Sequence, residues 1–170
     1  FLSHCHHLEK VKFVEMPHSL YRIEDGWMHQ CTQLVDIDFG QQQEGSANFN
    51  QLFSVGGNWL RSCQRLRTVE KTLFRQFQFL HHVDGGWLRD CHTLGPVDFD
   101  AGSPGNFPKL LSVGSHWLYG SRHPSFALVP PSTSSAPDGH DCVSGFASLA
   151  TIGNWWLGHI FTQRRLHIVG

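Results

Sequence analysis

The sequence has 170 residues, of which 40% are hydrophobic and 12% aromatic, so the chain can bury a sizeable core and does not resemble a disordered segment. Thirteen Lys and Arg balance fourteen Asp and Glu, and the formal net charge of −1 excludes the strong basic field that binding to a phosphate backbone requires. No apolar run approaches the roughly 18 residues of a membrane-spanning helix, and the first residues show no basic stretch followed by an apolar one. We therefore expect neither membrane insertion nor direct nucleic-acid contact.

One phrase recurs along the chain. Its fullest copy is FNQLFSVGGNWLRSCQRLRTV from Phe49 to Val69, and it returns from Phe77 as FQFLHHVDGGWLRDCHTLGPV. From Phe49, Phe77, Phe107 and Phe146, a Trp always follows ten residues later. A fixed period with variable filling is typical of a solenoid, in which no unit can bury its apolar side alone.

The period divides the chain into five to six coils of roughly 26–39 residues. Their approximate bounds are 1–26, 27–58, 59–86, 87–116, 117–155 and an incomplete 156–170. In the fifth coil Ser121 replaces the repeat Cys and Pro124 the repeat Leu; the sixth loses the register, and Leu166 and Val169 are the candidates to resume it. Because repeats reach both ends with no polar cap, we expect residues 1–170 to be one segment of a longer solenoid.

Each coil contains two kinds of local pattern. L-x-x-V-x-F, as at 8–13, 34–39 and 94–99, alternates as a short strand does, with Val and Phe inward and the residue between them outward. The stretch F-x-x-L-x-x-V-G followed by W-L-x-x-C mixes three- and four-residue spacings, and this pattern predicts a short helix or helical turn in part of it. Insertions rich in Pro, Ser, Gly and Asp at 40–47, 100–105 and 130–141 predict loops along one edge.

The phrase W-L-x-x-C-x-x-L-x-x-V-D-F followed by L-x-S-V-G resembles the cysteine-containing leucine-rich repeats of the BspA-like type, especially the versions abundant in kinetoplastid protozoa. The resemblance is strongest over residues 1–116. It implies an α/β leucine-rich-repeat solenoid with a parallel sheet on its concave side and one L-x-x-V-x-F strand per coil. It also implies protein binding without catalysis.

Two sets of repeat residues are expected to be interior. Cys5, Cys31, Cys63 and Cys91 occupy one repeat position, and their long spacing matches no short-loop zinc motif, so we interpret them as a buried cysteine ladder. Unpaired thiols in such a ladder favour a reducing, intracellular compartment. The second set is an interior stack of aromatic rings: Trp27, Trp59, Trp87, Trp117 and Trp156.

Other candidates for chemistry are weaker. His4, His6 and His7 around Cys5, and the His81–His82 pair, contain metal-ligand residues but no matching second set of ligands, so we assign no metal or cofactor. Cys142 lies off the register and is the expected reactive thiol, in a polar loop from Asp138. No G-x-S-x-G or G-x-x-x-x-G-K motif occurs, and we expect no catalytic residue and no enzyme activity.

The outward side of the L-x-x-V-x-F sheet is the candidate docking site. Its residues between Val and Phe, with two flanking carboxylates, are named the acidic column: Lys12, Asp36, Asp38, Glu70, Asp98 and Asp100. Stacked in register, these residues would suit a protein partner with a basic surface; an alternative is a merely solvated sheet, and another is docking on the loop edge. The sequence therefore predicts an interaction scaffold or docking module of a larger intracellular assembly. The alternatives are a structural subunit of a ribonucleoprotein or cytoskeletal particle and the recognition arm of a longer enzyme such as a ubiquitin ligase.

Overall fold

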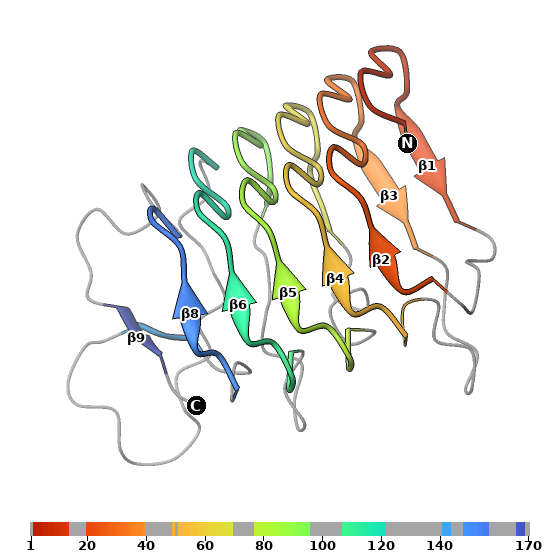
Figure 1. Cartoon of the computed structure of the whole chain (residues 1–170). Helices are drawn as coiled ribbons and strands as arrows, with labels where there is room; N and C mark the ends of the chain where they lie inside the picture. The colour runs from red at the N-terminus through yellow and green to blue at the C-terminus, as the bar shows by residue number, and fades with distance from the viewer. Residues whose placement is uncertain are drawn as a thin grey trace.

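The computed structural model describes residues 2–13, 20–39, 49, 51–69, 77–95, 107–121 and 148–156, together with the strands at 141–143 and 166–168. Within these residues the chain forms short strands and turns, and no helix. All strand pairs are parallel, and strands of successive repeats lie side by side in the order of the sequence (Figure 1). A repeat-like arrangement of parallel strands is therefore present, as the periodicity predicts.

The largest sheet has five strands, each followed by a turn toward the next Trp. Its strands are β2 (Arg22–Ile23), β4 (Ser54–Val55), β5 (His82–Val83), β6 (Ser112–Val113) and β8 (Thr151–Ile152). The register aligns the repeat Val or Ile of each strand with that of the next, from Ile23 to Ile152. This sheet occupies the F-x-x-L-x-x-V stretch, which the sequence analysis did not predict to be a strand.

The predicted L-x-x-V-x-F strand is present in the first two coils. β1 (Lys10–Lys12) pairs in parallel with β3 (Asp36–Asp38), and Val11 aligns with Ile37. Ile37 and Phe39 are fully buried, in agreement with the inward positions predicted for this pattern. The third and fourth copies extend into residues 70–76 and 96–106, which lie outside the described residues.

A third pair of parallel strands joins the last two coils. β7 (Asp141–Val143) pairs with β9 (Leu166–Ile168), and Cys142 aligns with His167. The polar loop predicted over 138–142 is thus wrong for Asp141 and Cys142, which lie in a strand. Leu166 begins β9, at the point where the sequence suggested that the repeat resumes.

The helix or helical turn predicted around W-L-x-x-C is also wrong in the described residues. The segments 26–31, 58–63, 86–91 and 116–121, here named the Trp turns, contain positive φ angles at alternate residues, for example 60° at Asn58, 56° at Leu60 and 59° at Ser62. The N–H of Asn58 donates to the Gly85 carbonyl at 2.8 Å, and that of Leu60 donates to the Trp27 carbonyl at 3.1 Å. A helix would need negative φ throughout and bonds within the segment, whereas each Trp turn is hydrogen-bonded to the repeats on both sides.

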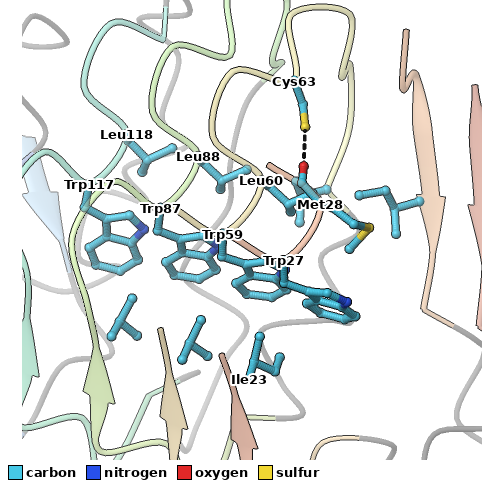
Figure 2. Packing of buried hydrophobic residues seen from close by; sticks show 14 of the residues in the cluster. Ile23, Trp27, Met28, Trp59, Leu60, Cys63, Trp87, Leu88, Trp117 and Leu118 are labelled. Atoms are coloured by element: carbon cyan, nitrogen blue, oxygen red, sulfur yellow. Dashed lines mark hydrogen bonds between the residues drawn. The ribbon is translucent and has the colours of Figure 1, made fainter. Parts of the chain in front are cut away.

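The core runs through the described repeats as rows of side chains from equivalent repeat positions. Figure 2 shows the rings of Trp27, Trp59, Trp87 and Trp117 in one row, with the residue that follows each Trp in a second row. Neighbouring Trp ring centroids are 5.5, 5.1 and 4.7 Å apart, and the planes of each pair lie within 15° of parallel. The predicted interior Trp stack is therefore confirmed, and it continues to Trp156 at 5.7 Å from Trp117.

Candidate docking surface

Two aspartates and two lysines of the first coils face each other across the β1–β3 pair. In this register Lys10 stands opposite Asp36, and Lys12 stands opposite Asp38. Lys12 Nζ lies 3.1 Å from Asp38 Oδ2, with the two side chains 69% and 32% exposed. An ion pair this exposed stabilises the fold by only about 0–1 kcal/mol. Asp36 and Asp38 lie on one strand, and they are the described part of the acidic column that a cationic partner would meet.

The rest of the acidic column lies outside the described residues. Glu70, Asp98 and Asp100 fall there, as do the loops at 40–47 and 100–105. The loop predicted at 130–141 does so too, apart from Asp141, the first residue of β7. The structure thus brings together Lys12, Asp36 and Asp38 of the proposed docking residues.

The cysteine ladder is interior and bonded to the backbone. Cys31, Cys63 and Cys91 are fully buried and Cys5 is half-buried, and all four are unpaired. The Cys63 thiol donates to the Met28 carbonyl at 3.1 Å, drawn in Figure 2, and the Cys91 thiol donates to the Leu60 carbonyl at the same distance. Ser121 is buried in the next coil and donates to the Leu88 carbonyl at 2.9 Å. The Ser that marked the fifth coil as divergent therefore makes the same bond as the Cys that it replaces.

Burial also keeps these thiols protonated. It raises the pKa of Cys63 to about 12, with a smaller contribution from Cys31, and it raises the pKa of Cys91 well above its usual value. The pKa of Cys31 is raised for the same reason. Because the thiolate is the nucleophile and the metal ligand, these positions are chemically inert at neutral pH.

The histidines near the N-terminus pack against one another without forming a ligand set. The ring of His4 lies 5.3 Å from that of His29 and 6.1 Å from that of His6. Burial lowers the pKa of His29, and the nearby Arg61 and His4 lower it further. Among the residues that the structure describes, no group of three or more His, Cys, Asp or Glu could hold a metal ion.

The rings of His81 and His82 both contact Phe53, but their Nδ1 atoms have different partners. The His81 ring stacks on Phe53 at 4.4 Å between centroids, and its Nδ1 lies 2.6 Å from the Phe79 carbonyl oxygen. His82 Nδ1 lies 2.8 Å from Ser112 Oγ in the neighbouring strand. The His82 ring also meets the edge of Phe53, at 5.4 Å between centroids, so the two histidines share one aromatic neighbour and differ in their polar partners.

A surface feature that the sequence analysis missed runs beside the five-stranded sheet. The residue directly after the repeat Leu lies next to its equivalents in the neighbouring coils, and four of these residues form what we name the aromatic stripe: Tyr21, Phe53, His81 and Leu111. Tyr21 stacks on Phe53 at 5.1 Å with 6° between the ring planes. Tyr21 is 57% exposed and Leu111 is 40% exposed. The sequence does contain a signal for this stripe. In three coils the residue after the repeat Leu is apolar (Tyr21, Phe53 and Leu111), although a strand with one buried and one solvent-exposed face would have a polar residue there.

Comparison with known proteins identifies no relative. No protein-family model, curated protein or solved structure matches the chain. In the described part of the chain there is also no helix of the length and apolarity needed to span a membrane. Function is therefore inferred from the acidic column and the aromatic stripe.

Proposed function

We propose that the chain is a segment of a leucine-rich-repeat solenoid that acts as a non-enzymatic protein–protein interaction scaffold. It would be a component of, or a docking module for, a larger intracellular assembly. One observation carries the proposal: residues at equivalent repeat positions lie next to one another, so that side chains of one kind form continuous columns across several strands. Such columns suit the recognition of an extended surface on another protein.

The acidic column is the proposed contact, and its partner would present Lys or Arg. Asp36 and Asp38 stand on the same strand, and Ile37 between them is buried, so both carboxylates belong to the outward side of β3. Charge complementarity of this kind contributes mainly to partner choice and association rate. The unpaired thiols of the cysteine ladder support a reducing compartment for the assembly.

The first test is recovery of partners. The tagged full-length protein is purified from its own cells at mild salt, and co-purifying proteins are identified by mass spectrometry. One or two partners are expected for a docking module, and the subunits of a single complex for a structural component. A catalytic subunit or domain in the same chain would favour the recognition-arm alternative. Recovery of the protein alone would contradict the docking proposal.

The second test is charge reversal of the acidic column. The double variant Asp36→Lys, Asp38→Lys should lower partner recovery by roughly tenfold, because like charges would then face a basic partner. The control is Asp84→Lys, a single charge reversal at an exposed carboxylate just after β5 on the other sheet. Unchanged recovery with the column variant would exclude the column and favour the loop edge at 40–47, 100–105 and 130–141.

A further inference from the structure

The aromatic stripe includes two of the exposed large hydrophobic side chains of the described surface, and a third lies beside it. Among the described residues, the large hydrophobic side chains that remain exposed are Tyr21, Phe79, Leu111, Ile152 and Trp155. Tyr21 and Leu111 belong to the stripe, and Phe79 lies two residues before the stripe residue His81, whose Nδ1 meets the Phe79 carbonyl. Contiguous exposed apolar side chains of this kind mark interaction sites more often than scattered ones do.

The core does not require these side chains. The inward residues of the same strands, Val55, Val83 and Val113, already fill the interior and are at most 2% exposed. Tyr21 and Leu111 lie beside them but are turned to solvent, at 57% and 40% exposed. A polar residue at these positions would leave the packing of the core unchanged. The apolar side chains are therefore better explained by contact with another molecule than by the stability of the fold.

The ring geometry restricts what could bind. Tyr21, Phe53 and His81 stack face to face, with 6° and 24° between successive ring planes, so the ring faces cover one another and ring edges are left for a ligand. Sugars and nucleobases stack on ring faces, whereas ring edges carry partial positive charge and accept apolar side chains and carboxylates. The arrangement therefore favours a protein segment.

The charges nearest to the stripe in the sequence favour an acidic segment, whereas the exposed carboxylates Glu24 and Asp84 lie three residues beyond Tyr21 and His81. Lys109 lies beside it, with Nζ 3.9 Å from the centre of the Phe79 ring, and His82 lies next to the stripe on β5. Arg22 follows Tyr21 and is paired with Glu24 at 3.1 Å, one residue beyond β2. Three repeat positions bear on the charge of the stripe: the stripe position itself, the position two residues before it and the position one residue after it. Among the described residues, none of these positions holds Asp or Glu. The residues are Tyr21, Arg22, Gln51, Phe53, Ser54, Phe79, His81, His82, Lys109, Leu111, Ser112, Ser148, Ala150 and Thr151.

We propose that the aromatic stripe, with Phe79 and Lys109, is a docking surface for a protein segment that carries apolar side chains next to carboxylates. The four stripe residues each directly precede one of four neighbouring parallel strands, so the stripe spans about 14 Å, the length of four to five residues of extended chain. The occupant is thus a short acidic-apolar motif of a partner protein. This inference rests on the proposed docking function, and it assigns a second contact surface with a charge preference opposite to that of the acidic column.

The test uses a displayed library of random peptides, selected on the immobilised full chain. Enriched peptides are synthesised, and their affinities are measured by fluorescence anisotropy. We expect enriched peptides to place Leu, Ile or Phe next to Asp or Glu. We also expect the double variant Tyr21→Ser, Leu111→Ser to bind them roughly tenfold more weakly, the usual scale for truncated central contacts.

Two further variants keep the test decisive. Lys109→Glu changes an exposed side chain, so it should weaken binding of the acidic peptides without affecting the fold. Trp155→Ser is the matched control, since it removes a 61% exposed aromatic ring outside the stripe and should leave affinity unchanged. Thermal unfolding of each variant verifies that the fold is retained.

Several outcomes would overturn the inference. They are the absence of any enriched peptide, enrichment of Lys- or Arg-rich peptides, and equal affinity for the wild type and the stripe variant. If partners are still recovered from cells with the stripe variant, only the stripe is refuted and the docking function stands. Recovery of no partner at all would instead count against the docking function itself.

Discussion

At the scale of single residues, the repeat positions differ in how replaceable they are. The position after W-L-x-x accepts Cys or Ser, because both are small and both donate to the carbonyl of the residue after the preceding Trp: Met28 for Cys63 and Leu88 for Ser121. The Trp position has less freedom, since Trp59, Trp87 and Trp117 each pack between two other Trp rings. Trp87 is fully buried between Trp59 and Trp117.

Truncating Trp87 should therefore be costly. We expect Trp87→Ala to lower the free energy of unfolding by roughly 3–5 kcal/mol, the range for removing a large buried aromatic ring. Urea unfolding measures the loss. Trp155→Ala serves as control, since that ring is 61% exposed and should lower stability far less. An unchanged unfolding midpoint for Trp87→Ala would refute its role in the stack.

The cysteine ladder predicts sensitivity to alkali. The pKa of Cys63 is about 12 in the folded chain against 9.0 for an exposed thiol, because burial penalises the thiolate. Between these pH values the unfolded chain releases the proton first, so the free energy of unfolding falls as pH rises. This thiol should contribute a decrease of about 1.4 kcal/mol per pH unit in that window.

Urea unfolding of the wild type and Cys63→Ser at increasing pH above 9 measures that contribution. The Ser variant keeps a donor for the Met28 carbonyl but loses the ionisable group, so its stability should fall less steeply with pH. Equal slopes for the two proteins would show that Cys63 ionises normally in the folded state.

At the scale of elements, close backbone packing between strands explains the glycines that follow the repeat Val. A Cβ built on Gly114 would collide with backbone atoms of Asp84 and Gly85 in the preceding coil, where no flexible side chain can move aside. Gly26 is different, because its Cβ would be 4.0 Å from the nearest atom, although its φ of +72° disfavours a side chain. Gly114 is therefore required because a Cβ would collide with the backbone of the preceding coil, and Gly26 is favoured because of its backbone conformation.

We expect Gly114→Ala to destabilise the fold much more than Gly26→Ala. The second change should cost roughly 1–2 kcal/mol, the penalty for a left-handed residue with a Cβ. The first should exceed it, since two strands of the five-stranded sheet would have to separate. Chemical unfolding of both variants tests this order, and a reversed order would mean that the strands can shift apart at little cost.

At the scale of the whole molecule, the net charge of −1 is an average over surfaces of different character. On β1 and β3, lysines face aspartates across one strand pair. Along the Trp turns, Arg61 and Arg89 share one carboxylate, with their Nε atoms 3.8 and 3.2 Å from Asp90 Oδ2. The aromatic stripe has Lys109 beside it. A chain that is nearly neutral overall can therefore offer separate partners surfaces of opposite preference, which is what the charge-reversal and peptide-selection experiments distinguish.

Periodic burial could be predicted from the sequence for a simple reason. Trp, Cys, Leu and Val recur at fixed spacings, and apolar side chains at equivalent positions must meet when repeats stack. The buried Trp stack, the buried Cys31, Cys63 and Cys91, and the parallel β1–β3 pair all follow from that pattern. So does the outward position of Lys12, because neighbours along a strand point to opposite faces.

The backbone conformation of the segments that connect the buried rows of Trp, Cys, Leu and Val side chains could be seen only in the tertiary structure. The Trp turns connect strands, and the sign of φ alternates along them. Their N–H groups donate to carbonyl groups of the repeats before and after: Leu60 N–H donates to the Trp27 carbonyl, and Ser62 N–H donates to the Arg89 carbonyl. Those partners are distant in sequence, and local spacing alone favoured a helical turn. The aromatic stripe escaped prediction for the same reason: the exposure of Tyr21 and Leu111 and the stacking of Phe53 on its neighbours depend on how adjacent coils align. The sequence by itself determined which residues are interior, and the bonds between repeats determined the surface that remains.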